Sequence, residues 1–386
     1  MRVFDESWVA EVRSRYGTKS TYVRPFVAFL ALEHSAAEER AKIEEWFKTL
    51  PDDIKPDFLG RLRGISKGQH LSAYYELVVR HLFQDMGYSV KMNPWLEEGE
   101  PDLLIEGKGL ETPIVVEVAT VFDEPRLIKE KEKQNKILAE LEKIQHYFFV
   151  TVSFRSDKIP EKVNYDKVRG FVERWLDSFD SRNIESGNAI SYREDGLWLD
   201  LILMPKTISE KSSIIGAVIY PVRWISDTQL KRAIEKKIQK YKSVKKLNSP
   251  YIVAACLDVS VPAGEEQAIN ALFGRLSVTV DIAKGGIVDE GRDFSGLVTP
   301  KPGLGGLARN RRLSALLVIR SRWLQPSDNG IGHRVHSAFI LHNPNAKIPL
   351  GQEFLKGYPQ FIKSHEDDKY VHLEWIDKDS KSLLDC

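Results

Sequence analysis

The chain has 386 residues, more than a single hydrophobic core usually serves, so two or three domains are expected. Its composition, 42% hydrophobic and 29% charged, is typical of a folded globular protein and excludes a largely disordered chain. Lys and Arg (56 residues) balance Asp and Glu (55 residues), so the overall charge indicates no nucleic-acid partner, and any basic surface has to be local.

Cysteine content and hydropathy narrow the class of protein further. Cys256 and Cys386 are too few for a disulfide framework or a thiolate zinc site. No apolar run approaches the roughly 20 residues that cross a bilayer, and no leader segment is evident. We therefore expect a cytoplasmic protein with no membrane partner.

The first part of the chain is predicted to be helical. Residues 1–66 form a helical N-terminal region, in which an acidic amphipathic segment ends at Pro51. A further helix is predicted over 71–86, where apolar residues recur on one face and Gly87 provides the stop.

Short strands follow this helix. The segments 88–94, 101–107 and 113–121 are rich in β-forming residues and are separated by turn residues. A charged helix is predicted over 126–143, and the apolar run 146–154 is typical of a strand buried on both faces. Residues 67–155 thus have the order helix, three strands, helix, strand.

The rest of the chain, residues 156–386, is predicted to be a C-terminal α/β region that binds substrate or partners. Its order of strands near 197–204 and 214–220, a basic helix over 229–246 and a buried-type strand over 251–257 faintly echoes residues 101–153. The fold class is therefore α/β.

Three carboxylates are candidates for a metal site. Asp102 opens one predicted strand, and Glu117 lies in the next strand among apolar neighbours, where an ionised carboxylate is costly without a partner. If the two strands pair as a hairpin, the two carboxylates come together. Glu76 on the preceding helix is the third candidate, and such oxygen ligands suit Mg²⁺.

Taken one at a time, two of these acids also have ordinary explanations. Asp102 after a proline is a common turn-capping residue, and Glu76 matches a solvated glutamate on an amphipathic helix. Glu117 differs, because its face of the strand is not plainly polar. The metal site depends on all three occurring in these elements and in this order.

At these residues the chain resembles the PD-(D/E)XK, or restriction-endonuclease-like, nuclease superfamily. The matching features are Pro101 with Asp102, Glu117 followed by Ala119, the helical Glu76 and the element order of residues 67–155. The resemblance implies a Mg²⁺- or Mn²⁺-dependent nuclease in which Asp102 and Glu117 hold the metal and Glu76 assists. The longer chain also resembles a group of uncharacterised bacterial proteins built on this core.

One position departs from the family pattern. Ala119 stands where the family has a lysine, which would position the attacking water and stabilise the charged transition state. Either the following helix supplies the lysine, from Lys129, Lys133 or Lys136, or the core has lost catalysis and only binds. Lys133 is the candidate that we carry forward.

A basic helix in the C-terminal region is the candidate nucleic-acid contact. Its residues have little acidic compensation, and a cationic stripe of this kind suits the phosphates of a duplex. The alternative is a solvated helix face, which is what charge runs usually form. The candidate contact residues are Lys231, Lys236, Lys237, Lys240 and Tyr241.

The predicted function is hydrolysis of phosphodiester bonds by a metal-dependent endonuclease. The resemblance to the family favours DNA over RNA as the substrate. One alternative is a catalytically inactive nucleic-acid-binding module. Another is a protein-interaction subunit of a bacterial defence or mobile-element assembly. A homodimer or a partner subunit is expected, because one such site cuts one strand.

Overall fold

A computed structural model describes residues 1–97, 99–107, 109–122, 124–156, 158–179, 187–206, 210–220, 226–241, 248–257, 264–281, 286–300, 308–324, 333–366, 371–378 and 383–384. These residues form a mixed α/β structure, as the sequence predicts. The end of the predicted basic helix, residues 242–246, lies outside them.

The chain divides into two compact units that do not follow the boundaries expected from the sequence. Unit 1 comprises residues 1–10, 30–122 and 224–386, and unit 2 comprises residues 11–29 and 123–223. The expected ranges were continuous, 1–66, 67–155 and 156–386. In the structure the second range is divided, because the chain leaves unit 1 after residue 122 and re-enters it at residue 224.

Unit 1 is built on a mixed sheet that has nine strands among the described residues. The strand order is β1-β2-β3-β10-β13-β14-β15-β16, with β17 also paired to β14. β3 pairs antiparallel with β2 and parallel with β10. The bounds are β1 (Ser89–Met92), β2 (Leu103–Glu106), β3 (Ile114–Val121), β10 (Tyr251–Leu257), β13 (Ala315–Leu324), β14 (His333–His342), β15 (Gln360–Glu366), β16 (Val371–Ile376) and β17 (Leu383–Leu384). A separate hairpin joins β11 (Leu276–Asp281) and β12 (Gly286–Arg292).

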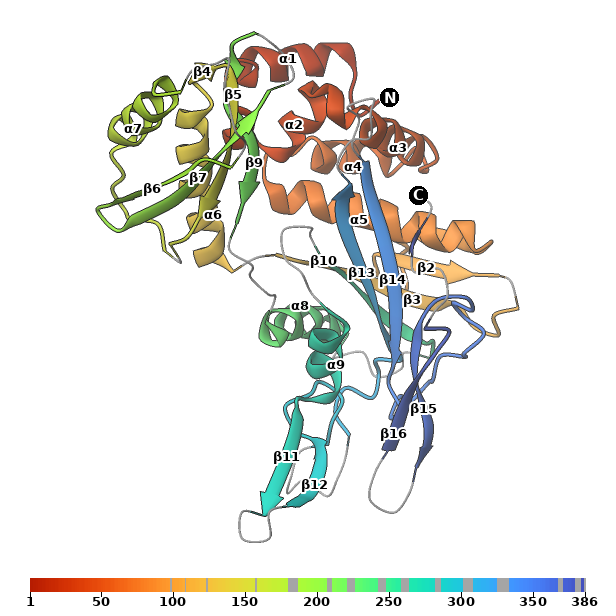
Figure 1. The fold of residues 1–386 in the computed structure, drawn as a ribbon. Helices are drawn as coiled ribbons and strands as arrows, with labels where there is room; N and C mark the ends of the chain where they lie inside the picture. The colour runs from red at the N-terminus through yellow and green to blue at the C-terminus, as the bar shows by residue number, and fades with distance from the viewer. Residues whose placement is uncertain are drawn as a thin grey trace. The chain divides into compact units, whose positions relative to one another are not determined.

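Helices cover both faces of this sheet (Figure 1). α5 (Lys67–Asp85) packs against β3 and β1 on one face, while α8 (Asp227–Lys240) packs against β3 and β10 on the other. Burial on both faces explains why β10 is a continuous apolar run and why β3 is apolar apart from Glu117 and Thr120. The other helices of this unit are η2 (His34–Ala36), α3 (Ala37–Lys48), α4 (Lys55–Leu62) and α9 (Glu265–Phe273), and the division between the units falls within α1 (Glu6–Tyr16) and α2 (Phe26–Leu32).

Unit 2 has its own sheet and its own core. Its strand order is β6-β7-β5-β9, and the apolar side chains of α6, α7 and these strands form one buried cluster. The bounds are η1 (Thr21–Val23), α6 (Pro125–Leu141), β4 (Gln145–His146), β5 (Phe148–Phe154), α7 (Tyr165–Asp177), β6 (Ala189–Glu194), β7 (Leu197–Pro205), β8 (Ser212–Ser213) and β9 (Ile215–Ile219).

One predicted neighbour of β3 differs from the structure. From the sequence, the helix over 126–143 and the strand over 146–154 complete the sheet that contains β3. In the structure these residues form α6 and β5 in unit 2, and β10 is the parallel neighbour of β3. Both strands are buried apolar runs that follow a charged helix, so the local pattern does not distinguish them.

The helical character of residues 1–66 and the antiparallel pairing of the second and third strands are confirmed. Within the described ranges, no helix has the length and apolar character needed to cross a membrane.

Candidate functional site

Asp102 and Glu117 come together at the paired strands β2 and β3. The register places Leu103 opposite Val116, so the residue before β2 lies next to Glu117. The Asp102 Oδ2 atom accepts a hydrogen bond from the Val118 backbone N–H at 2.7 Å, which fixes the carboxylate against β3. The hairpin expected from the sequence therefore brings the two acids side by side.

A single ammonium group bridges the two carboxylates. Lys237 Nζ lies 2.6 Å from Asp102 Oδ2 and 2.8 Å from Glu117 Oε2. Burial alone lowers the pKa of Lys237, but the charges of Asp102 and Glu117 outweigh it, and the net pKa is raised. The lysine is therefore charged at neutral pH, and the two acids already converge on one cation.

Glu117 is completely buried and has further partners on its other oxygen. Lys240 Nζ lies 2.6 Å from Glu117 Oε1, and the Tyr241 hydroxyl donates to the same atom at 2.7 Å. The pKa of Tyr241 is raised by burial and by the negative charge of Glu117, so the phenol stays a donor. The buried carboxylate thus has the partners that its apolar surroundings require.

All three of these partners come from one face of α8 and its C-terminal cap. Lys237, Lys240 and Tyr241 are spaced by three and four residues, which places them on a common face of a helix. The strand that follows, β10, sets Val253 beside Glu117 in a parallel pair. The pairing of β10 with β3, and the packing of α8 against both strands, therefore hold this face over the middle of β3.

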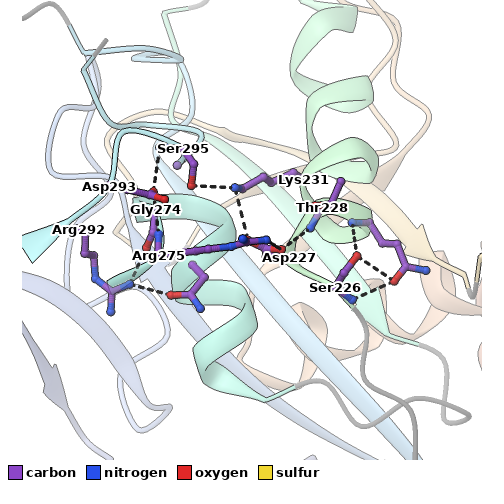
Figure 2. Close-up of polar contacts among 12 residues, drawn as sticks. Ser226, Asp227, Thr228, Lys231, Gly274, Arg275, Arg292, Asp293 and Ser295 are labelled. Atoms are coloured by element: carbon purple, nitrogen blue, oxygen red, sulfur yellow. Dashed lines mark hydrogen bonds and ion pairs between the residues drawn. The ribbon is translucent and has the colours of Figure 1, made fainter. Parts of the chain in front are cut away.

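The N-terminus of α8 is fixed by the cluster in Figure 2, which involves the end of α9. Ser226 and Gln229 form a reciprocal capping box. Arg275 donates to both oxygens of Asp227, at 2.8 and 3.0 Å, and Lys231 Nζ lies 3.7 Å from the same carboxylate. The Arg275 hydrogen bond is the main reason that the pKa of Asp227 is lowered to about 2.

The turn after α9 requires glycine for this cluster to form. Gly274 has φ 93°, and a Cβ atom there would lie 2.1 Å from the carbonyl oxygen of Asp293. Because the backbones approach so closely, Arg275 N can donate to Asp293 Oδ1 at 2.9 Å while its side chain reaches Asp227 (Figure 2). The position of α8 over the carboxylates thus depends on a packed polar contact at its other end.

Glu76 on α5 is buried and has a cation of its own. Arg61 on α4 donates to both of its oxygens, at 2.7 and 2.9 Å. Burial raises the pKa of Glu76, and Arg61 only partly opposes this effect. The charge of Asp102 also raises the pKa of Glu76 and that of Lys237 lowers it, but the ion pair of this acid is with Arg61. Among the described contacts, Glu76 is therefore not one of the acids that converge on Lys237.

The remaining predicted site residues lie elsewhere. Lys133 is on α6 in unit 2, where its ammonium contacts Glu161 at 2.8 Å and the Ile159 carbonyl at 3.2 Å. Lys231 belongs to the cluster at the start of α8 and donates to Ser295 at 3.3 Å. Lys236 is exposed.

The geometry can be compared with the needs of a divalent cation. Within the described ranges, no group of three or more His, Cys, Asp or Glu side chains is arranged to hold a metal ion. Mg²⁺ is commonly held by one or two carboxylates, with waters and substrate phosphates as its other ligands. Asp102 and Glu117 fit this smaller set, since the Lys237 ammonium already occupies a cation position between them.

Sequence reasoning missed two features of this site. Lys237, Lys240 and Tyr241 were assigned to nucleic-acid contact, and Arg61 was not singled out. The sequence held one signal for the first feature. Residues 229–257 resemble residues 126–154, since each segment is a charged helix followed by a buried strand, so either helix could supply the cation that Glu117 needs.

A scan of protein-family models gives no match for this chain, and searches of curated proteins and of solved structures find no significant relative.

Proposed function

We propose that this protein is a divalent-metal-dependent nuclease that hydrolyses phosphodiester bonds, with DNA as its preferred substrate. The observation that carries the proposal is the convergence of Asp102 and Glu117 on a single cation, 2.6 and 2.8 Å away. In a nuclease metal site the protein typically provides one or two carboxylates, and waters and the substrate phosphate complete the coordination.

The arrangement of elements in unit 1 supports this proposal. α5, β1, β2 and β3 are followed in the same sheet by β10, with α8 packed against both β3 and β10. This is the helix, three strands, helix, strand order implied by the resemblance to PD-(D/E)XK nucleases. On this interpretation residues 123–223 are inserted between the third strand and the second helix of the core.

The same interpretation accounts for Ala119. The resemblance implies a lysine at this position. In unit 1, α8 is the helix that precedes β10, the parallel neighbour of β3, and it packs against both strands. Lys237 on α8 contacts both carboxylates, so it is a better candidate for the displaced lysine than Lys133. We therefore assign the catalytic lysine role to Lys237.

Each residue then has a definite task. A divalent ion held by Asp102 and Glu117 would supply Lewis-acid polarisation of a phosphoryl oxygen and lower the pKa of a bound water. Lys237 is long and one quarter exposed, so it can turn from the carboxylates toward the phosphate, where its charge stabilises the transition state. Tyr241 keeps Glu117 oriented through its hydroxyl.

A second candidate function, nucleic-acid binding without cleavage, is favoured by the same ion pairs. Glu76 is paired with Arg61, and Glu117 with Lys237 and Lys240, so the described residues already balance these buried charges without a metal. Such a network can be purely structural.

Cleavage of plasmid DNA distinguishes the two. With Mg²⁺ or Mn²⁺ we expect nicking that Asp102→Asn and Glu117→Gln abolish. Lys237→Ala should reduce the rate by about 100-fold or more, whereas Lys133→Ala should leave it nearly unchanged. Metal-independent or absent cleavage, together with salt-sensitive DNA binding, would favour the binding module.

Metal affinity gives a readout that does not depend on activity. Titration with Mn²⁺ alone should show one site in the wild-type protein and tighter binding in Lys237→Ala, because the competing ammonium is gone. Asp102→Asn and Glu117→Gln should bind Mn²⁺ weakly or not at all. If Lys237→Ala binds no Mn²⁺, the two carboxylates are not a metal site.

A further inference from the structure

A cavity lies on the side of α8 that faces away from the carboxylates. Residues of α8, of 308–312 and of the loop at 347 surround this cavity of about 530 Å³. Its lining includes Gln239, Ile238, Asn310, Arg311, Arg312 and Lys347. The size falls within the range of pockets that bind small molecules.

The charge of this cavity is strongly positive. Arg311, Arg312 and Lys347 contribute three positive charges, and Glu235 is the acid among its lining residues. Within the described part of the chain, none of the three cations forms an ion pair. The two arginines donate to backbone carbonyls, Arg311 to that of Asn345 at 3.3 Å and Arg312 to that of Tyr241. Their charge is therefore free to attract an anion.

The cavity is distinct from the carboxylate cluster. Glu235 and Gln239 are one turn apart on α8 and lie roughly opposite the helix face that carries Lys237 and Lys240. A ligand in the cavity is thus separated from Asp102 and Glu117 by the helix itself. This separation argues for a second ligand, because the phosphate under attack would have to lie beside the carboxylates.

We propose that this cavity binds a small phosphate ester of nucleotide size. Arg311, Arg312 and Lys347 provide charged donors for the phosphate group, and guanidinium groups suit its oxygens particularly well. The amides of Asn310 and Gln239 provide neutral hydrogen bonds, and Ile238 with Ala308 forms an apolar wall for a ring. This combination of a few polar groups and an apolar surface is typical of small-molecule pockets.

Arg312 connects this site to the carboxylate cluster. Its guanidinium donates to the backbone carbonyl of Tyr241, whose hydroxyl donates to Glu117. A phosphate that draws Arg312 into the cavity would weaken the first of these contacts. Variants that test binding should therefore leave Arg312 unchanged, so that Tyr241 keeps its anchor.

Calorimetric titration with ADP, AMP and inorganic phosphate, in EDTA and without DNA, tests the proposal. We expect saturable binding of ADP or AMP that Arg311→Ala with Lys347→Ala weakens by roughly tenfold or more, since each lost group is a charged donor. Both positions are exposed, so the fold should tolerate the change. The control pair, Arg155→Ala with Lys356→Ala, removes the same charge from exposed positions outside the cavity and should bind as the wild type does.

Two outcomes would overturn the proposal. One is the absence of saturable ADP and AMP binding, or binding that the double variant does not weaken. The other is a double variant that loses binding to a single-stranded oligonucleotide but keeps its affinity for ADP, which would make the cavity a nucleic-acid contact. Neither result depends on whether the protein cleaves DNA.

Discussion

Two parts of the chain have nearly the same local sequence character and different positions in the structure. α6 with β5 in unit 2, and α8 with β10 in unit 1, are each a charged helix followed by a strand that is largely buried. β5 pairs with β7 and β9, whereas β10 lies beside β3 and Glu117. The helix that packs against the strand of Glu117 is therefore α8, although α6 is the next helix along the chain.

Each helix also carries a lysine near a buried acid, and the surroundings of the two pairs differ. On α6, Lys133 shares its charge with Glu130 and the exposed Glu161, and Glu130 also accepts from the Ile159 N–H at 2.6 Å. On α8, Lys237 bridges two carboxylates, one of them fully buried. The comparison indicates a local ion pair in unit 2 and a convergent charge cluster in unit 1.

The largest expected effect on stability is at Lys237. Lys237→Met leaves Glu117 buried with one cation fewer, so we expect the free energy of unfolding of unit 1 to fall by about 2–4 kcal/mol. Hydrogen exchange of the β3 amides during urea titration measures this loss. Lys133→Met is the matched change in unit 2, where Glu130 keeps its backbone donor, and β5 amides should exchange almost as in the wild type. Equal losses in the two units would contradict the distinction.

A smaller effect is expected at the Tyr241 hydroxyl. Tyr241→Phe removes a hydrogen bond to a buried carboxylate and should destabilise unit 1 by about 2 kcal/mol. Tyr251 offers a control, because its ring packs against Tyr241 and its buried hydroxyl has no hydrogen-bond partner among the described residues. Tyr251→Phe should be neutral or slightly stabilising in the same measurement. A loss as large as that of Tyr241→Phe would show that packing, and not the carboxylate contact, sets the stability.

The smallest effect is expected at the start of α8. Asp227→Asn should destabilise unit 1 by about 1 kcal/mol near neutral pH, because it removes the negative charge at a helix N-terminus and beside Arg275. The folded pKa of Asp227 is about 2 and its ordinary value is 3.8, so the charge contributes stability above pH 3.8 that is lost as the pH falls toward 2. Urea unfolding of both proteins at neutral and at acid pH checks this, and a difference that grows with acidity would contradict it.

Several features of unit 1 were predictable from local pattern. The apolar face and glycine stop predict α5, and the β-branched runs predict β2 and β3. The burial of Glu117 among apolar neighbours requires a partner, and Asp102 was expected beside it. The structure has both features.

The partners of Glu117 were harder to predict, because Lys237, Lys240 and Tyr241 lie 120 to 124 residues further along the chain. A buried acid in a strand indicates that a cation is needed, but any charged helix that follows can supply it. α6 and α8 both satisfy that condition, and only the pairing of β10 with β3 selects α8.

The sequence by itself determined the α/β class, the hairpin of β2 and β3, and the two acids that meet there, because these follow from residue patterns and short spacings. The tertiary structure decided which lysines reach those acids, that Arg61 holds Glu76, and where the cationic cavity lies. These contacts join segments far apart in the chain, and their geometry depends on which strands pair and how helices pack on the sheet.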